Sequence, residues 1–114
     1  MGCIQDNELL YEYGKEVARQ CKEIGVQINF APVADVDVNP RNPVINTRSF
    51  GGDPRNVAQK VVAYARGLED GGVLSVCKHF PGHGDTEVDS HKALPVLNFD
   101  RARLDSIELF PFKE

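Results

Sequence analysis

The sequence predicts an α/β fold in which short parallel strands are joined by helical crossovers. Amphipathic helical stripes alternate along the 114-residue chain with short apolar runs typical of strands. Polar loops follow both apolar runs, at the carboxyl ends of the strands, where α/β proteins build their sites. A parallel sheet is normally buried on both faces, and a sheet of only two strands is too small to achieve this. We therefore expect this fold to be incomplete on its own.

The first half of the chain predicts a helix, a strand and a long loop. The apolar side of the helix repeats at spacings of three and four. Asp6 or Asn7 can cap its start, and Gly25 is placed to end it. Apolar residues then alternate from Val26, as in a strand, and the proline and aspartate within residues 31–36 indicate that the strand ends there. Residues 37–52 have little periodicity and predict a loop. The helical stripe consists of Leu10, Tyr13, Val17, Cys21 and Ile24.

The next helix and strand have clear boundaries in the sequence. Asp53 is a predicted N-cap, with Pro54 in the first helical turn. The glycine pair at 71–72 is placed to end this helix, and Val73–Cys77 is a short apolar strand of the buried parallel type. A polar loop with several glycines follows, from Lys78 to about Leu94. The stripe of the helix consists of Val57, Val61, Ala65 and Leu68.

A third helix is predicted near the end of the sequence. Asp100 can cap it, and its apolar side would hold Leu104, Ile107 and Leu109. The chain shows no internal repeat and no low-complexity segment.

The composition narrows the class of protein. Hydrophobic residues make up 41% and charged residues 26%, the balance of a globular domain. A net charge of -4 gives no reason to expect nucleic acid or an anionic membrane as a partner. No apolar run approaches the roughly 20 residues of a membrane span, and the first residues lack the features of a signal peptide. The compartment therefore stays open. Three well-separated cysteines are expected to be packing residues.

The densest chemistry lies in the segment Lys78–His91, which holds all three histidines of the chain. Histidine is suited to proton transfer near neutral pH. Asp89 precedes His91 by two residues, and such a carboxylate can orient an imidazole and stabilise its charged form. The segment follows a buried strand, so a proton-transfer site is favoured over a solvated loop without function.

A zinc site is the alternative from the residues alone. Five side chains of the kinds that zinc prefers lie in the loop. However, Pro81 and Gly82 separate the first two histidines, so the helical geometry of an HExxH site is lost and no metal is expected. The candidate ligands are His79, His83, Asp85, Asp89 and His91.

The earlier loop adds further candidates. Arg48 could clamp hydroxyls or a carboxylate with its planar guanidinium, or it could be an ordinary surface arginine. Asp35 and Asp37 lie near a strand end and are as suited to capping loop amides as to touching a substrate.

Several linked segments closely resemble glycoside hydrolase family 3, and in particular its β-N-acetylglucosaminidases of the NagZ type. The resemblance covers the chain from about residue 6 to 114. It implies a (β/α)8 TIM barrel, of which residues 1–114 would form about two to three βα units of the N-terminal catalytic domain. The matching segments are Asn29–Val36, Arg48–Gly51, Lys78–Thr86, Asp89–His91 and Leu94–Pro95.

The resemblance also implies roles for individual residues. In this type of enzyme a histidine replaces the usual acid/base carboxyl, and the reaction retains configuration through a covalent glycosyl-enzyme intermediate. The substrate would be a terminal N-acetylglucosaminide, and no metal or organic cofactor is needed. The implied roles are His91 as acid/base with Asp89 as its partner, Arg48, Lys78 and His79 as sugar-binding residues, and His83 and Asp85 as residues that shape and tether the loop.

The implied nucleophile, an aspartate on a later strand, matches no residue of this chain. We therefore expect the isolated chain to be inactive, and to associate with the rest of a barrel or with itself. A family 3 β-glucosidase is an alternative, although the Asp89–His91 pair speaks against it. Phosphorolysis instead of hydrolysis is another. A third alternative, from a different class, is a non-catalytic sugar-binding or scaffold piece.

Overall fold

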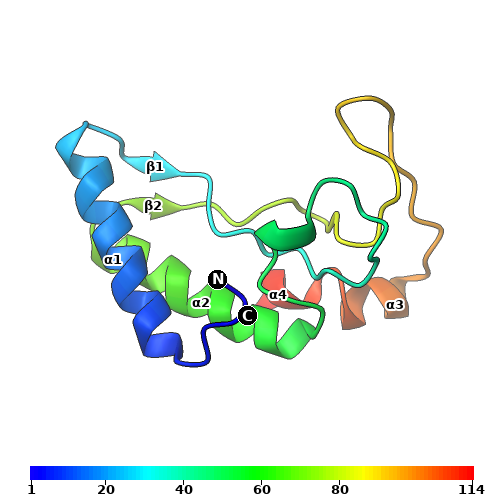
Figure 1. Cartoon of the computed structure of the whole chain (residues 1–114), viewed down its shortest axis with the longest axis horizontal. Helices are drawn as coiled ribbons and strands as arrows, with labels where there is room; N and C mark the ends of the chain where they lie inside the picture. Colours follow the sequence, from blue (N-terminus) through cyan, green and yellow to red (C-terminus); the bar gives the residue numbers. More distant parts are fainter.

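Two long helices lie side by side along two short parallel strands in the computed structural model, which describes residues 1–114 (Figure 1). The predicted order of helices, strands and loops is confirmed, and the parallel pairing of the strands confirms an α/β arrangement. No helix has the length and apolar character needed to cross a bilayer. The elements are α1 (Asn7–Glu23), β1 (Ile28–Asn29), the 3-10 helix η1 (Asn46–Arg48), α2 (Pro54–Asp70), β2 (Leu74–Ser75), α3 (Arg101–Ser106) and α4 (Phe110–Lys113).

The ends of α1 and α2 follow the predicted signals. Asp6, and not Asn7, caps α1, by accepting a hydrogen bond from the Glu8 N–H. Asp53 caps α2 in the same way. Beyond each helix a glycine takes a left-handed conformation, Gly25 with φ of 79° and Gly72 with φ of 86°. The crossed hydrogen bonds around both glycines are those of a Schellman motif, which satisfies the last carbonyls of a helix.

The two long helices approach closely because two glycines face each other between them. A Cβ on Gly67 would lie 2.1 Å from the carbonyl oxygen of Tyr11, and one on Gly14 would lie 2.5 Å from that of Tyr64. Tyr13, at 47% exposure, lies less deep than the stripe predicts, although its ring stacks on that of Tyr64. The core centres on Leu10, Ala18, Ala34, Val36, Phe50, Val57, Val61, Tyr64, Leu68 and Val73.

Both strands are shorter than predicted. The ladder pairs Ile28 with Leu74 and Asn29 with Ser75, and it resumes only as an isolated parallel bridge between Val33 and Lys78. The predicted end of the strand within residues 31–36 agrees with this break in the ladder. Pro32 lies within it and has no N–H to donate to a ladder.

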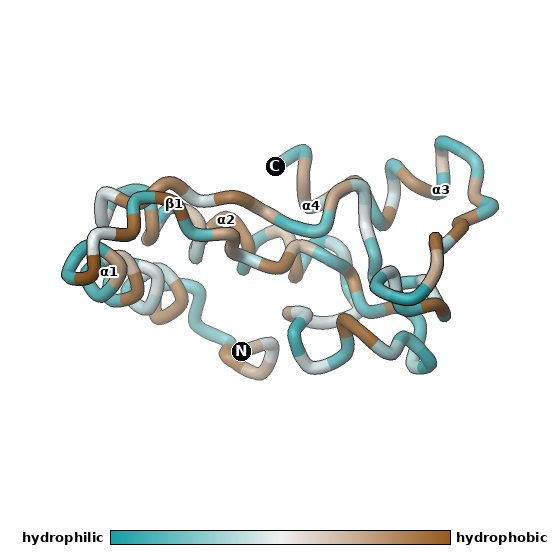
Figure 2. The backbone as a smooth tube through the Cα atoms, turned by 90° about the horizontal axis from the view of Figure 1, so that it is seen from above, coloured by the Kyte–Doolittle hydropathy of each residue, from teal (hydrophilic) through white to brown (hydrophobic).

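The sheet face turned away from α1 and α2 is uncovered. Alternating apolar side chains on this face are exposed, although parallel strands of this kind are normally buried on both faces. Figure 2 shows hydrophobic segments along the same stretch. The exposed residues are Val26, Ile28, Phe30, Leu74 and Val76.

The predicted third helix is two short ones. Asp100 caps α3 as predicted, by accepting from the Arg103 N–H, but α3 ends at Ser106. Ile107 follows it with non-helical dihedrals, and α4 starts at Phe110. A continuous helix is blocked because the ring of Pro111 would clash with the carbonyl of residue 107, four positions earlier.

Candidate active site

The site is built where the chain leaves the two strands. The Ala34 N–H donates to the Lys78 carbonyl at 2.6 Å, and the Lys78 N–H donates to the Pro32 carbonyl at 3.0 Å. These bonds hold residues 34–37 beside the start of the polar loop, far apart in sequence but adjacent in space (Figure 1). Side chains from both segments can therefore share one site.

Asp35 lies at the centre of this junction and is fully buried. Its Oδ2 accepts a hydrogen bond from the His79 backbone N–H at 3.1 Å and lies 2.6 Å from His79 Nδ1. Its Oδ1 accepts from the His83 backbone N–H at 2.6 Å. Of the two roles that the sequence left open for Asp35, the carboxylate performs the capping of loop amides. It also binds an imidazole, which the sequence did not predict.

The other ring nitrogen of His79 faces Arg48. Arg48 Nη2 lies 3.4 Å from His79 Nε2, and Arg48 Nη1 donates to the Val44 carbonyl. A guanidinium can only donate, so Nε2 is the acceptor and the ring proton lies on Nδ1, toward Asp35. The structure thus brings together Arg48 and His79, two of the three predicted sugar-binding residues. Lys78 directly precedes His79 in the sequence, and only its main chain is hydrogen bonded.

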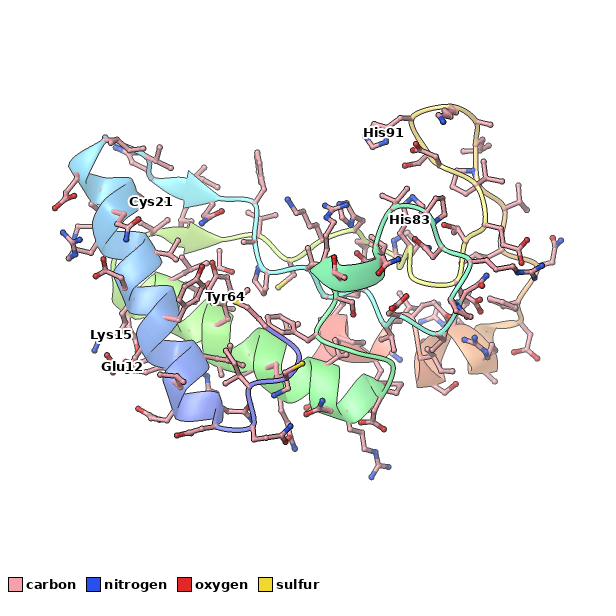
Figure 3. All side chains as sticks on the ribbon, viewed as in Figure 1. Glu12, Lys15, Cys21, Tyr64, His83 and His91 are labelled. Carbon is pink, nitrogen blue, oxygen red and sulfur yellow. The ribbon has the colours of Figure 1, made fainter.

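His83 is buried at the base of the loop that carries His91 (Figure 3). Its Nδ1 is hydrogen bonded to the Thr86 hydroxyl, and its Nε2 lies 3.0 Å from the Ser90 hydroxyl. Asn42 donates to the His83 carbonyl at 2.6 Å. Asn42 and Ser90 were not predicted to contribute. An asparagine within a Pro- and Asn-containing loop was the available signal for Asn42.

Asp85 connects the loop to the C-terminal helices. Arg103 Nη2 donates to Asp85 Oδ2 at 2.9 Å, and Nη1 of the same guanidinium donates to both carboxylate oxygens of buried Glu108. Asn39 donates to the Asp85 carbonyl. The contacts of Asp85 are therefore to protein groups on two sides of the loop.

Asp89 and His91 form a hydrogen-bonded pair near the tip of the loop. His91 Nδ1 lies 2.7 Å from Asp89 Oδ1, which also accepts from the His91 backbone N–H at 2.9 Å. The backbone N–H of His91, followed by its ring, holds the pKa of the Asp89 carboxyl below its ordinary value. The side chain of His91 is 82% exposed and that of Asp89 is 27% exposed. His91 Nε2 is left without a protein partner.

The candidate residues thus form two groups. Asp35, Arg48 and His79 meet at the strand ends, whereas Asp89 and His91 lie on the loop, and no hydrogen bond joins the two groups. The five candidate zinc ligands are not gathered, since no three His, Cys, Asp or Glu side chains are placed to hold a metal ion. The three cysteines are free thiols.

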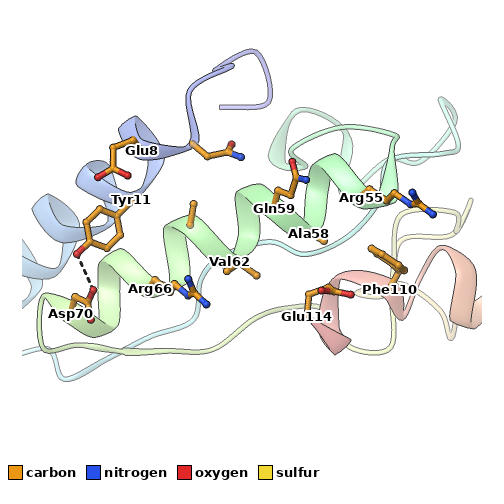
Figure 4. Close-up of a pocket in the computed structure, with 12 residues that line it drawn as sticks. Glu8, Tyr11, Arg55, Ala58, Gln59, Val62, Arg66, Asp70, Phe110 and Glu114 are labelled. Atoms are coloured by element: carbon orange, nitrogen blue, oxygen red, sulfur yellow. Dashed lines mark hydrogen bonds between the residues drawn. The ribbon is translucent and has the colours of Figure 1, made fainter.

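A separate groove lies on the helical side of the molecule. It has a volume of about 990 Å³ and runs between α1, α2 and α4 (Figure 4). Tyr11 donates to Asp70 at one end of it, at 2.8 Å, and Arg55 and Arg66 also line it. None of the candidate site residues lines this groove.

The chain is a parallel α/β unit with a histidine–carboxylate pair on a loop beyond its strand ends. This arrangement is typical of enzymes. Comparison with known proteins defines it further. All of residues 1–114 match the glycosyl hydrolase family 3 N terminal domain, and the chain belongs to this family. The predicted family is therefore confirmed.

Similar proteins of this family include several named enzymes. The chain is 47% identical over 98 residues to β-hexosaminidase A of Pseudoalteromonas piscicida, covering 86% of this chain and 16% of that protein. The structure of a family 3 β-N-acetylglucosaminidase from Paenibacillus sp. matches with a TM-score of 0.95 at 46% identity, covering 98% of this chain and 21% of that one. NagZ from Neisseria gonorrhoeae, solved in complex with N-trifluoroacetyl-D-glucosamine, matches with a TM-score of 0.86 at 37% identity, over 94% of this chain and 31% of that one. The chain therefore spans about a sixth to a third of the length of these relatives.

Proposed function

We propose that this chain is part of a retaining glycoside hydrolase that releases terminal β-linked N-acetylglucosamine, with His91 as the acid/base residue and Asp89 as its partner. The observation that carries the proposal is the Asp89–His91 pair, joined at 2.7 Å on a loop beyond the strand ends. The similar enzymes are named β-hexosaminidases and β-N-acetylglucosaminidases, which supports the choice of sugar.

The geometry of the pair suits proton transfer in both directions. Asp89 accepts from Nδ1 of His91 and stabilises the imidazolium form of the ring. Nε2 then carries a proton that it can donate to the departing glycosidic oxygen. Once a glycosyl-enzyme intermediate has formed, the neutral ring can take a proton from the attacking water. The same residue serves both steps, and the proton returns to Nε2 after each turnover.

Sugar binding is assigned to the group at the strand ends. Arg48, Lys78 and His79 would hydrogen bond to ring hydroxyls, and the guanidinium and imidazole are already in contact at 3.4 Å. A group held in place before the substrate arrives loses less entropy on binding. His83 and Asp85 would act on the loop and not on the sugar, since both are engaged by protein groups.

The catalytic domain of the proposed enzyme is a (β/α)8 barrel, and this chain supplies about two to three of its βα units. The uncovered apolar face of β1 and β2 supports this, because the remaining strands and the barrel core would bury it. The nucleophile would be a carboxylate outside residues 1–114. No metal or organic cofactor takes part in the proposed reaction.

The test replaces His91 in the protein expressed from its complete reading frame. For His91→Ala we expect kcat/KM to fall by roughly 10²- to 10⁴-fold on an N-acetylglucosaminide with a poor, alcohol leaving group. The fall should be much smaller on a nitrophenyl substrate, whose leaving group needs little protonation. Exposed Lys92→Ala is the matched control and should keep both activities. Equal, small losses of activity on both substrates would remove His91 from this role.

The same assay, run with other substrates, in phosphate buffer and with a chelator, distinguishes the alternative activities. Faster turnover of β-glucosides than of N-acetylglucosaminides would favour a β-glucosidase, and a sugar phosphate formed in phosphate buffer would favour a phosphorylase. Activity lost on chelation and restored by zinc would favour metal-dependent hydrolysis. Residues 1–114 alone should be inactive, and robust turnover by them would contradict the assignment of the nucleophile.

A further inference from the structure

We infer that Asp35 is a positioning residue that sets where the proton lies on His79 and also anchors the base of the loop that carries His91. The inference rests on the proposed function, since it assigns His79 to sugar binding and His91 to proton transfer. Asp35 touches neither substrate nor reacting atoms and acts through these two histidine-containing segments.

The carboxylate of Asp35 is surrounded by N–H donors of the protein. Asp35 is fully buried, so water does not solvate its charge. It is instead satisfied by three N–H groups, two from His79 and one from His83. A buried carboxylate is tolerated only when it is hydrogen bonded in this way, and removing its partners would be costly. The three donors and the carboxylate therefore hold one another in place.

The contact with Asp35 fixes the state of the His79 ring. With Nδ1–H donated to Asp35, Nε2 is left as the nitrogen that faces Arg48 and the open side of the site. Such a pairing selects the tautomer and ring orientation of a histidine. The side chain of His79 remains 34% exposed. A sugar hydroxyl can therefore reach a ring nitrogen whose hydrogen-bonding role is already decided.

The same carboxylate is also linked to the acid/base loop. Asp35 Oδ1 accepts from the His83 N–H, and the His83 ring is hydrogen bonded to Ser90. Ser90 lies between Asp89 and His91 in the sequence. A chain of two hydrogen bonds therefore connects the residue that orients the sugar-binding histidine to the segment that carries the proton-transfer pair.

The test is Asp35→Asn in the complete protein, which keeps the shape of the side chain and removes its charge. The new amide N–H would face an N–H of His79 or His83. We expect the neutral His79 ring to move its proton to Nε2, where it meets the N–H of Arg48. The predicted loss in kcat/KM is about 10- to 100-fold, by analogy with the partners that orient metal-binding histidines.

The deciding readout is the tautomer of His79, measured by long-range ¹H–¹⁵N NMR with labelled histidine and assigned with His79→Gln. The wild type should carry the proton on Nδ1, and Asp35→Asn should shift it to Nε2. Asp37→Asn is the control, because it makes the same charge change two residues away and Asp37 bonds to neither histidine. It should leave the tautomer unchanged.

Two results would overturn the inference. One is a wild-type His79 with its proton on Nε2, a measurement that does not require any variant to fold. The other is an Asp35→Asn protein that loses activity while His79 keeps its Nδ1 proton. Failure of the proposed function would look different: the wild-type tautomer would be as inferred, but the complete protein would not hydrolyse N-acetylglucosaminides.

Discussion

The base and the tip of the loop from Lys78 to His91 are held in different ways. At the base, His83 is buried and bonded to residues 41 and 48 positions away in the sequence, Asn42 and Asp35. At the tip, the hydrogen bonds of His91 reach only to Asp89, two residues away, and its side chain is 82% exposed. The tip is taken as residues 89–92, and among these Ser90 provides the one bond back to the base.

This difference matches the two roles proposed for the site, with sugar recognition at the base of the loop and proton transfer at its tip. Long-range bonds to buried groups give the base a single arrangement, which favours recognition of a rigid sugar ring. The hydrogen bonds of the Asp89–His91 pair are local, so they survive if residues 89–92 move as a unit. A local hydrogen-bonded turn can thus bring His91 to the glycosidic oxygen without breaking the Asp89–His91 pair. Loops that move in this way are drawn from the least stable parts of a structure.

The largest effect on stability and activity is expected from a substitution that displaces the base of the loop. A Cβ on Gly84 would lie 1.8 Å from the carbonyl oxygen of Val36, which belongs to the rigid backbone after β1. Gly84→Ala must therefore push the loop away from the strand end, and overpacking of this kind costs about 1–3 kcal/mol. We expect a lower melting temperature and a strong loss of kcat/KM, measured by thermal unfolding and by the hydrolysis assay.

The matched control for Gly84→Ala adds one atom next to the tip. Ala93 is exposed, and Ala93→Ser should change neither the melting temperature nor the activity. Wild-type stability in Gly84→Ala would mean that the base can shift freely, and the contrast between base and tip would be lost.

Local signals in the sequence predicted the helix ends, whereas distant contacts decided the rest. Asp53 and Gly72 act within a few residues of their own positions, so their roles could be read directly. The role of Asp35 depends on His79, 44 residues away, and no periodicity encodes that contact. The strand lengths were overestimated because each strand has a partner on one side only. The pairing of Asp89 with His91 was predictable since they are two residues apart.

A smaller effect is expected from cutting the bond between base and tip. Ser90→Ala removes the hydroxyl that meets His83 Nε2 at 3.0 Å, and a single hydrogen bond of this kind contributes about 1 kcal/mol. Because the base keeps its other bonds, the melting temperature should barely change. The exchange rates of amide protons from Asp89 to Lys92 should rise. Unchanged exchange at the tip would show that Ser90 does not restrain it.

Ser90→Thr provides the comparison for this change. It keeps a hydroxyl at the same position and should restore slow exchange if the hydrogen bond to His83 is the restraint. Faster exchange in both variants would point to packing of the small side chain instead.

The smallest effect concerns protonation of the pair at the tip. The His91 backbone N–H and then its ring hold the pKa of Asp89 below its ordinary value, which is about 3.9. A lowered carboxyl pKa means that the pair is stabilised above the ordinary value and loses this stabilisation as the pH falls through the lowered one. The ¹³C signal of the Asp89 carboxyl should therefore titrate below about pH 3.9. His91→Ala keeps the backbone N–H, so it should move the midpoint only part of the way back. A full return to the ordinary value would show that the ring alone lowers the pKa, and an ordinary value in the wild type would mean that the pair does not form in solution.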